Sequence, residues 1–84
     1  MDKFSKMIIP QVLKTVKNRD SSMDEIRERV CRMLRLSTGP FVVLTVKEVS
    51  QKLGPILTDL IQKKRIHLLA DNQVLFAYNF LYDE

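Results

Sequence analysis

Residues 44–61, LTVKEVSQKLGPILTDLI, decide the expected fold because Gly54 and Pro55 divide them into two apolar segments. Thr45 and Glu48 have the spacing of a capping box, in which a Thr oxygen accepts from the third helical N–H and the Glu reaches back. Glycine commonly ends one helix, and proline suits the first turn of the next. The stretch therefore predicts two short helices joined by a turn.

The second helix, expected over roughly 55–64, would turn its leucines inward and Thr58, Asp59 and Gln62 outward. Thr58 and Gln62 can hydrogen-bond base edges, whereas Asp59 repels phosphate. Residues 63–65 (KKR) end this helix, where cations oppose the negative end of its dipole. They also form the densest basic cluster in this half of the chain and its best candidate for a phosphate contact.

Downstream, the apolar period changes from 3.6 to two, which indicates strands. Apolar side chains occupy the even positions Ile66, Leu68, Ala70, Val74, Phe76, Tyr78 and Phe80. A three-residue loop at 71–73 pairs Ala70 with Val74 and Leu68 with Phe76, so all even positions share one face. We therefore predict an antiparallel hairpin whose even-numbered aromatic residues face the core.

The odd positions of the hairpin are apolar as well, namely Leu69, Leu75, Ala77 and Leu81. One core cannot cover both faces of so small a sheet, so a lid is expected on the odd face. An N-terminal amphipathic helix is the natural lid, from the same chain or from a second copy. A mutual lid would make the protein a homodimer.

Residues 2–18 supply this helix. Its apolar side holds Phe4, Ile8, Ile9, Val12, Leu13 and Val16, and its other side holds Lys3, Lys6, Lys14 and Lys17. Such a basic stripe can bind a phosphate backbone, an acidic protein or an anionic membrane, and it is also the pattern of a solvated helix face. Pro10, on the polar side, is expected to kink the helix or to start a new one.

A further helix is expected over roughly 23–36, with Ser22 and Glu25 as its capping box. Its core face would hold Met23, Ile26, Val30, Met33 and Leu34. Stabilising i,i+4 ion pairs are expected between Glu25 and Arg29 and between Glu28 and Arg32.

The resulting order is helix, strand, helix, helix and hairpin, with FVVL (41–44) as the short strand after Gly39-Pro40. Through TVKEVSQKLG (45–54) and LIQKKRIHLLADNQVLFAY (60–78), the chain resembles the winged-helix group of helix-turn-helix domains. The resemblance covers roughly residues 23–80 and implies an α+β, mainly helical fold. That fold would be a winged-helix-like three-helix core with a C-terminal β-hairpin wing.

In this arrangement residues 1–20 form an extra N-terminal helix, docked or dimerising, and residues 21–84 form the winged-helix-like domain. The chain departs from the group's pattern at the recognition helix, because Gly54 and Leu60 are only six positions apart. The wing tip at 71–73 also lacks Lys and Arg. These departures favour a second hypothesis, in which the fold is a scaffold that does not bind DNA.

Charge is distributed unevenly. The 84 residues have a formal net charge of +4. Residues 1–36 hold nine Lys/Arg and five Asp/Glu, whereas residues 37–84 hold five of each, so the excess lies wholly in the N-terminal part.

The leading hypothesis is a small, DNA-binding, regulatory protein that acts as a homodimer in the cytoplasm, with duplex DNA in preference to RNA as the expected target. The expected nucleic-acid-binding residues are Lys3, Lys6, Lys14, Lys17, Thr58, Gln62, Lys63, Lys64 and Arg65. The alternative is a protein–protein interaction or scaffold subunit, with an acidic protein as the partner of the basic stripe.

Other classes of function find little support in the sequence. One cysteine (Cys31) and one histidine (His67) fall short of a zinc site, and a lone cysteine fits a reducing compartment. The longest apolar run, 41–44, is too short for a membrane span. No glycine-rich phosphate loop or nucleophile–base pair is present. We therefore expect no enzymatic activity, no metal and no cofactor.

Overall fold

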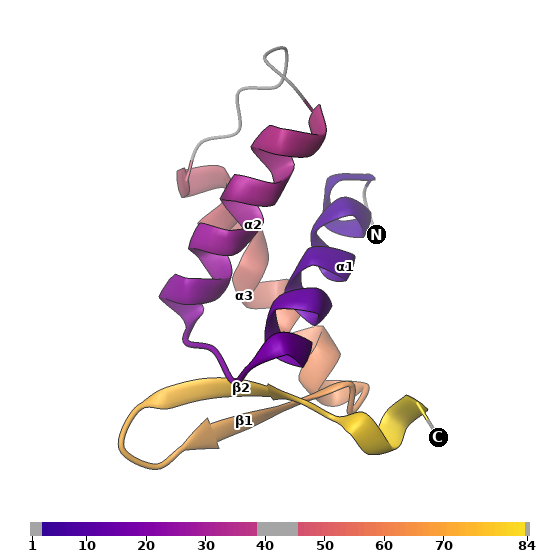
Figure 1. Ribbon diagram of the computed structural model, residues 1–84, viewed down its shortest axis with the longest axis vertical. Helices are drawn as coiled ribbons and strands as arrows, with labels where there is room; N and C mark the ends of the chain where they lie inside the picture. The colour runs from indigo at the N-terminus through magenta and orange to yellow at the C-terminus, as the bar shows by residue number, and fades with distance from the viewer. Residues whose placement is uncertain (1–2, 39–45, 84) are drawn as a thin grey trace.

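The computed structural model describes residues 3–38 and 46–83 as three helices followed by a hairpin and a short 3-10 helix (Figure 1). The elements are α1 (Lys3–Asn18), α2 (Met23–Thr38), α3 (Val46–Gln62), β1 (Ile66–Ala70), β2 (Val74–Tyr78) and η2 (Phe80–Asp83). The predicted α+β, mainly helical class with a C-terminal hairpin is confirmed. The predicted strand at 41–44, the helix end at Gly39-Pro40 and the cap at Thr45 lie outside the described residues.

The predicted turn at Gly54-Pro55 is wrong, because α3 runs from Val46 to Gln62 as one helix. Its buried residues keep a single 3.6-residue period through the break: Val49, Leu53, Ile56, Leu57 and Leu60. A proline in a helix interior costs about 3 kcal/mol. Burying each large aliphatic side chain contributes roughly 1.5–3 kcal/mol, so a stripe of five outweighs the local break.

The surroundings of Gly54 and Pro55 keep the free-energy cost of having these two residues inside a helix small. A Cβ added at Gly54 would meet nothing within 4 Å, and Pro55 is exposed. The missing N–H of Pro55 leaves the carbonyl of Gln51 without its helical donor, but Gln51 is exposed and water can replace the bond. In α1, similarly, no new helix starts at Pro10, which is exposed inside a single helix.

The described chain therefore has three helices in place of the expected four. α1 is one of the three that build the core, and it is not an addition to a three-helix core formed without it. The two short helices expected on either side of Gly54-Pro55 form one helix, α3, so no recognition helix is separated from a preceding one.

The predicted hairpin register is confirmed. Ala70 pairs with Val74 and Leu68 with Phe76, around the loop at 71–73. Phe76 and Tyr78 are buried as expected. The loop end of the hairpin projects past the helices (Figure 1). Leu68 is accordingly 50% exposed, although it lies on the same face of the hairpin as Phe76 and Tyr78.

All three helices lie on the same side of the hairpin (Figure 1). Their buried side chains form one core with the even face of the hairpin: Ile8, Val12, Val16, Ile26, Val30, Leu34, Val49, Leu53, Ile56, Leu57, Leu60, Ile66, Phe76 and Tyr78. The expectation that α1 of the same chain covers the odd face is therefore wrong, and Leu69 on that face is 41% exposed.

The link between α1 and α2 ties both helices to β2. Ser21 is fully buried and exchanges two backbone hydrogen bonds with Phe76, at 3.0 and 2.7 Å. Its hydroxyl donates to the carbonyl oxygen of Arg19 at 2.9 Å. Ser22 then caps α2, because its Oγ accepts from the backbone N–H of Glu25 at 3.2 Å, which confirms the Ser half of the predicted capping box. This short link holds α1 beside α2 and so creates the groove described next.

Candidate nucleic-acid interface

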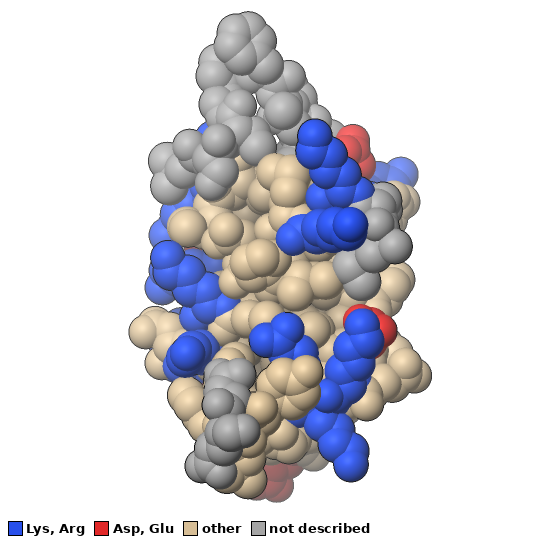
Figure 2. Space-filling model, turned by 90° about the vertical axis from the view of Figure 1, so that its right-hand side faces the viewer, with Lys and Arg blue, Asp and Glu red and all other residues tan. Residues whose placement is uncertain are grey.

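The lysines of α1 form one stripe, with the exposed Pro10 between Lys6 and Lys14. Lys3, Lys6, Lys14 and Lys17 are all exposed, and α1 contains no acidic residue. At 100° per residue the four positions fall within an arc of roughly 80°, opposite the buried side of the helix. Figure 2 shows the side of the molecule on which α1 lies, where Lys and Arg side chains are spread over the surface and acidic ones are few.

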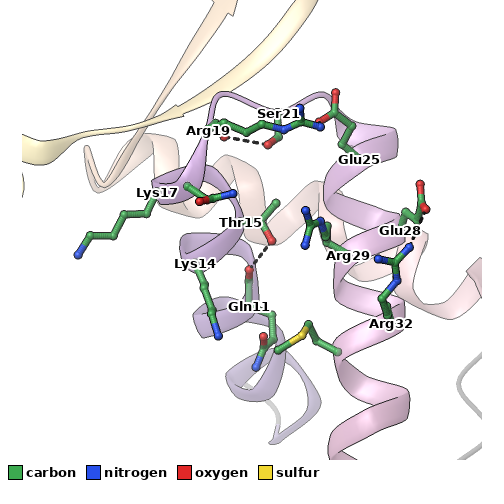
Figure 3. Close-up of a pocket in the computed structure, with 12 residues that line it drawn as sticks. Gln11, Lys14, Thr15, Lys17, Arg19, Ser21, Glu25, Glu28, Arg29 and Arg32 are labelled. Carbon is green, nitrogen blue, oxygen red and sulfur yellow. Dashed lines mark hydrogen bonds and ion pairs between the residues drawn. The ribbon is translucent and has the colours of Figure 1, made fainter.

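A groove of about 710 Å³ runs between α1 and α2 (Figure 3). Its charged lining consists of Lys14, Lys17, Arg19, Glu25, Glu28, Arg29 and Arg32. Five of these side chains are basic and two are acidic, so the groove is positively charged. The stripe on α1 meets it at Lys14 and Lys17.

Both acidic groups in the groove are already neutralised. Glu25 Oε2 lies 2.8 Å from the guanidinium of Arg19, and Glu28 Oε1 lies 3.1 Å from that of Arg32. The second pair was predicted from its spacing. The first replaces the predicted Glu25–Arg29 pair, which is wrong because Arg19, from the α1–α2 link, reaches the carboxylate instead.

Arg29 consequently has no ion-pair partner within residues 3–38 and 46–83. Figure 3 shows its side chain extending from α2 toward Thr15 of α1. Lys14 and Lys17 also lack a carboxylate partner in that part of the chain, although the Lys17 ammonium lies 5.3 Å from the centre of the Tyr78 ring. These three cations are available to an anion, because no acid among the described residues is paired with them.

The other predicted binding residues lie on or just after α3, which does not line this groove. Thr58 Oγ1 donates to the carbonyl oxygen of Gly54 at 3.0 Å, so its hydroxyl proton is already used. Lys63 is paired with Asp59 at 3.1 Å. Gln62 is exposed. The structure therefore does not gather the predicted α3 residues into a second basic site.

The last two predicted residues connect α3 to β1. Lys64 is exposed and has a left-handed backbone with φ 61°. Arg65 is half-buried, and its guanidinium lies 5.0 Å from the ring centre of Tyr82. The Nε of Arg65 is buried without a hydrogen-bond partner within the described residues. Arg65 is thus partly a structural side chain, and of the KKR run only Lys64 is an exposed cation with no acidic partner among the described residues.

The groove arginines were not among the residues predicted to bind. Arg29 was assigned to helix stabilisation because its i,i+4 neighbour is Glu25. The signal that could have identified it is Arg19, a competing cation six positions before Glu25. This separation is not an i,i+3 or i,i+4 helical spacing, because Arg19 lies in the link between α1 and α2 and Glu25 lies on α2.

Within the described residues, no group of three or more His, Cys, Asp or Glu side chains could hold a metal ion. Cys31 is a half-buried free thiol on α2. None of the helices in the described ranges has the length and apolar character that crossing a membrane requires.

Comparison of the chain with protein-family models, with curated proteins and with solved structures finds no match. The groove must therefore be interpreted from its own geometry and charge.

Proposed function

We propose that this protein binds the phosphate backbone of duplex DNA through the basic stripe of α1 and the groove between α1 and α2. The observation that carries the proposal is the set of uncompensated cations in the groove, Lys14, Lys17 and Arg29, whose neighbouring acids are paired elsewhere. Affinity for nucleic acid comes largely from neutralising phosphates, and these groups are free to do so.

The dimensions of α1 support this proposal. From Lys3 to Lys17 the stripe extends about 21 Å at 1.5 Å per residue. Phosphates of one DNA strand recur every 3.4 Å along the axis, so the stripe can follow the backbone past several of them. A lysine is a compact charge with three donors and contacts phosphate without base specificity.

Binding is expected to depend little on sequence. Base readout needs a side-chain array presented to a groove of DNA, and of the predicted one on α3 only Gln62 is exposed without a hydrogen bond to its own helix. Thr58 donates within its own helix, and Asp59 lies beside Lys63 on the same surface. A general DNA-binding protein, which would regulate through occupancy, fits these features better than a sequence reader.

The direct test is a titration of random-sequence duplex DNA at several salt concentrations. The chain offers a matched comparison, because four of its eight lysines lie on α1 and four lie at positions 47, 52, 63 and 64. Replacing either set with Gln removes the same charge. We expect substitution of the four α1 lysines to reduce the slope of log affinity against log salt by roughly 0.9 per lost contact. Substitution of the other four lysines should reduce it much less.

Equal losses from the two sets would contradict the assignment to α1. Absence of duplex binding by the wild-type protein at low salt would reject DNA binding altogether. In that case salt-dependent binding of polyglutamate would favour an acidic protein partner, the second hypothesis. One feature favours a protein partner, namely a set of exposed apolar side chains: Leu68, Val74, Phe80, Leu81 and Tyr82.

A further inference from the structure

The hairpin has one occupied edge and one open edge. The outer edge of β2 is paired, because Phe76 forms an isolated antiparallel bridge with Ser21. In the part of the chain that the structure describes, β1 pairs with β2 alone. The outer edge of β1 therefore has no partner strand.

The register identifies which backbone groups point out from this edge. Phe76 uses its N–H and its carbonyl on Ser21, so both point away from β1. Leu68 lies directly opposite Phe76. In an antiparallel pair, the N–H and carbonyl groups of two opposite residues either point toward each other or both point away from the other strand. Leu68 therefore presents its N–H and carbonyl at the open edge, and so do Ile66 and Ala70, two residues away on either side.

This edge carries none of the features that usually prevent strand addition. The sequence IHLLA (66–70) contains no Lys, Arg, Asp, Glu or Pro. Leu68 and Leu69 are 50% and 41% exposed, on opposite faces of the strand. Natural edge strands are usually protected by charge, proline or a bulge, and an exposed apolar edge without them is a template for another strand.

We propose that β1 pairs with β1 of a second copy of this chain, antiparallel about a two-fold axis at Leu68. Two hairpins then make one continuous four-stranded sheet. Leu68 faces Leu68 of the partner subunit, and Ile66 faces Ala70 of the partner subunit. The outward backbone groups of these residues satisfy one another across the axis, as an isologous interface requires.

Charge complementarity at the ends of the strand selects this partner and this register. With the axis at Leu68, Arg65 lies directly opposite Asp71 of the partner subunit, and the pair occurs twice. Arg65 and Asp71 flank β1 at its two ends. In the proposed sheet the alternation of the strand extends to both, which puts their side chains on the odd face, where the non-hydrogen-bonded pairs have the closest side chains. Asp71 is exposed and has no ion-pair partner within residues 3–38 and 46–83.

Other two-fold registers lose this match. Sliding the partner strand by two residues places Leu69 or Gln73 of the partner subunit opposite Arg65 and leaves one end of each strand unpaired. Sliding it by one residue turns the apolar faces to opposite sides. The side chain of Arg65 is already held against Tyr82, which limits the conformational freedom lost when the ion pair forms.

Mass in solution tests the interface. The chain has a mass of 9.8 kDa, and sedimentation over a range of concentrations should show the wild type at twice that mass. Leu68→Lys puts two ammonium groups opposite each other at the axis and should raise the dissociation constant about tenfold or more. Val46→Lys is the matched control, since Val46 is also 50% exposed but lies at the start of α3. It should leave the mass unchanged.

Two further measurements test the register. Asp71→Arg should weaken the dimer, and the double variant Arg65→Asp/Asp71→Arg should restore it. Amide hydrogen exchange should slow with rising concentration at Ile66, Leu68 and Ala70, whereas His67 and Leu69, bonded to β2, should be protected at every concentration. Circular dichroism of each variant separates a lost interface from a lost fold.

A wild type that remains at 9.8 kDa throughout would overturn the proposal. So would a dimer that Leu68→Lys leaves intact, because its interface would then lie elsewhere. A dimer that Leu68→Lys breaks but Asp71→Arg does not change would reject the register. None of these outcomes depends on whether the protein binds DNA.

Discussion

Helices α1 and α3 pack alike and are charged differently. They have 16 and 17 residues, each with an internal proline on its exposed side and a buried apolar stripe. Yet α1 holds four lysines and no acid, whereas α3 balances two lysines against Glu48 and Asp59. The core constrains only the buried side of a helix, so the outer side is free to differ. α3, which takes the place of the helix pair expected to contact DNA, is neutral, and α1, outside that motif, carries the charge.

The largest expected effect concerns the hydrophobic core, to which α1 and α3 both contribute. Phe76 is 7% exposed and belongs to the core that α1, α2 and α3 build on the hairpin. Phe76→Ala should lower the free energy of unfolding by roughly 3–5 kcal/mol, which is a large fraction of the stability of a domain this small. Urea denaturation measures it. Leu81→Ala is the control: Leu81 is 73% exposed, so its truncation should cost little. Equal losses would place Phe76 outside the core.

The prolines test whether the two helices are equally continuous. Pro10→Ala and Pro55→Ala should each stabilise the protein, by roughly 1–3 kcal/mol, because alanine restores a helical N–H and removes the ring. Thermal denaturation measures both. If Pro55 instead opened a second helix after a turn, its replacement would be neutral or destabilising. If only Pro10→Ala increased the stability, α1 would be a continuous helix and α3 would not.

Gly54 tests the same continuity with a smaller effect. Gly54→Ala should stabilise the protein by roughly 0.5–1 kcal/mol, because the site is helical and alanine lowers the entropy of the unfolded chain. The added methyl group meets open space. At a left-handed helix end, by contrast, alanine would be strained and the variant less stable. A lowered melting temperature would therefore contradict a continuous α3.

The smallest effect compares one lysine from each region. Lys14 lies in the groove without an acidic partner among the described residues, whereas Lys63 is paired with Asp59. Lys14→Gln should remove about one phosphate contact, so the fall in DNA affinity between 50 and 200 mM salt should be about threefold smaller than for the wild type. Lys63→Gln should follow the wild type. Identical curves for Lys14→Gln and the wild type would exclude Lys14 from the interface.

Local sequence information determined the faces of the helices and the pairing of the hairpin. The 3.6-residue period identifies Val12, Val16 and Ile26 as buried, because a helix turns the same side to the core at each repeat. The period of two, with a three-residue loop, pairs Ala70 with Val74, because any one-residue slip would reverse every side chain. In both cases the evidence lies within a few residues along the chain.

Only the tertiary structure decided that α3 continues through Gly54 and Pro55 and which cations lack an acidic partner. Gly54 and Pro55 are strong local signals for a turn, but the core holds Leu53 and Ile56 on one stripe and outweighs them. Glu25 has two cations within reach, and the α1–α2 link brings Arg19 to it, which leaves Arg29 open to the groove. Each result depends on a competition between a local preference and a contact made by another part of the chain. Spacing along the sequence describes the first and contains no measure of the second.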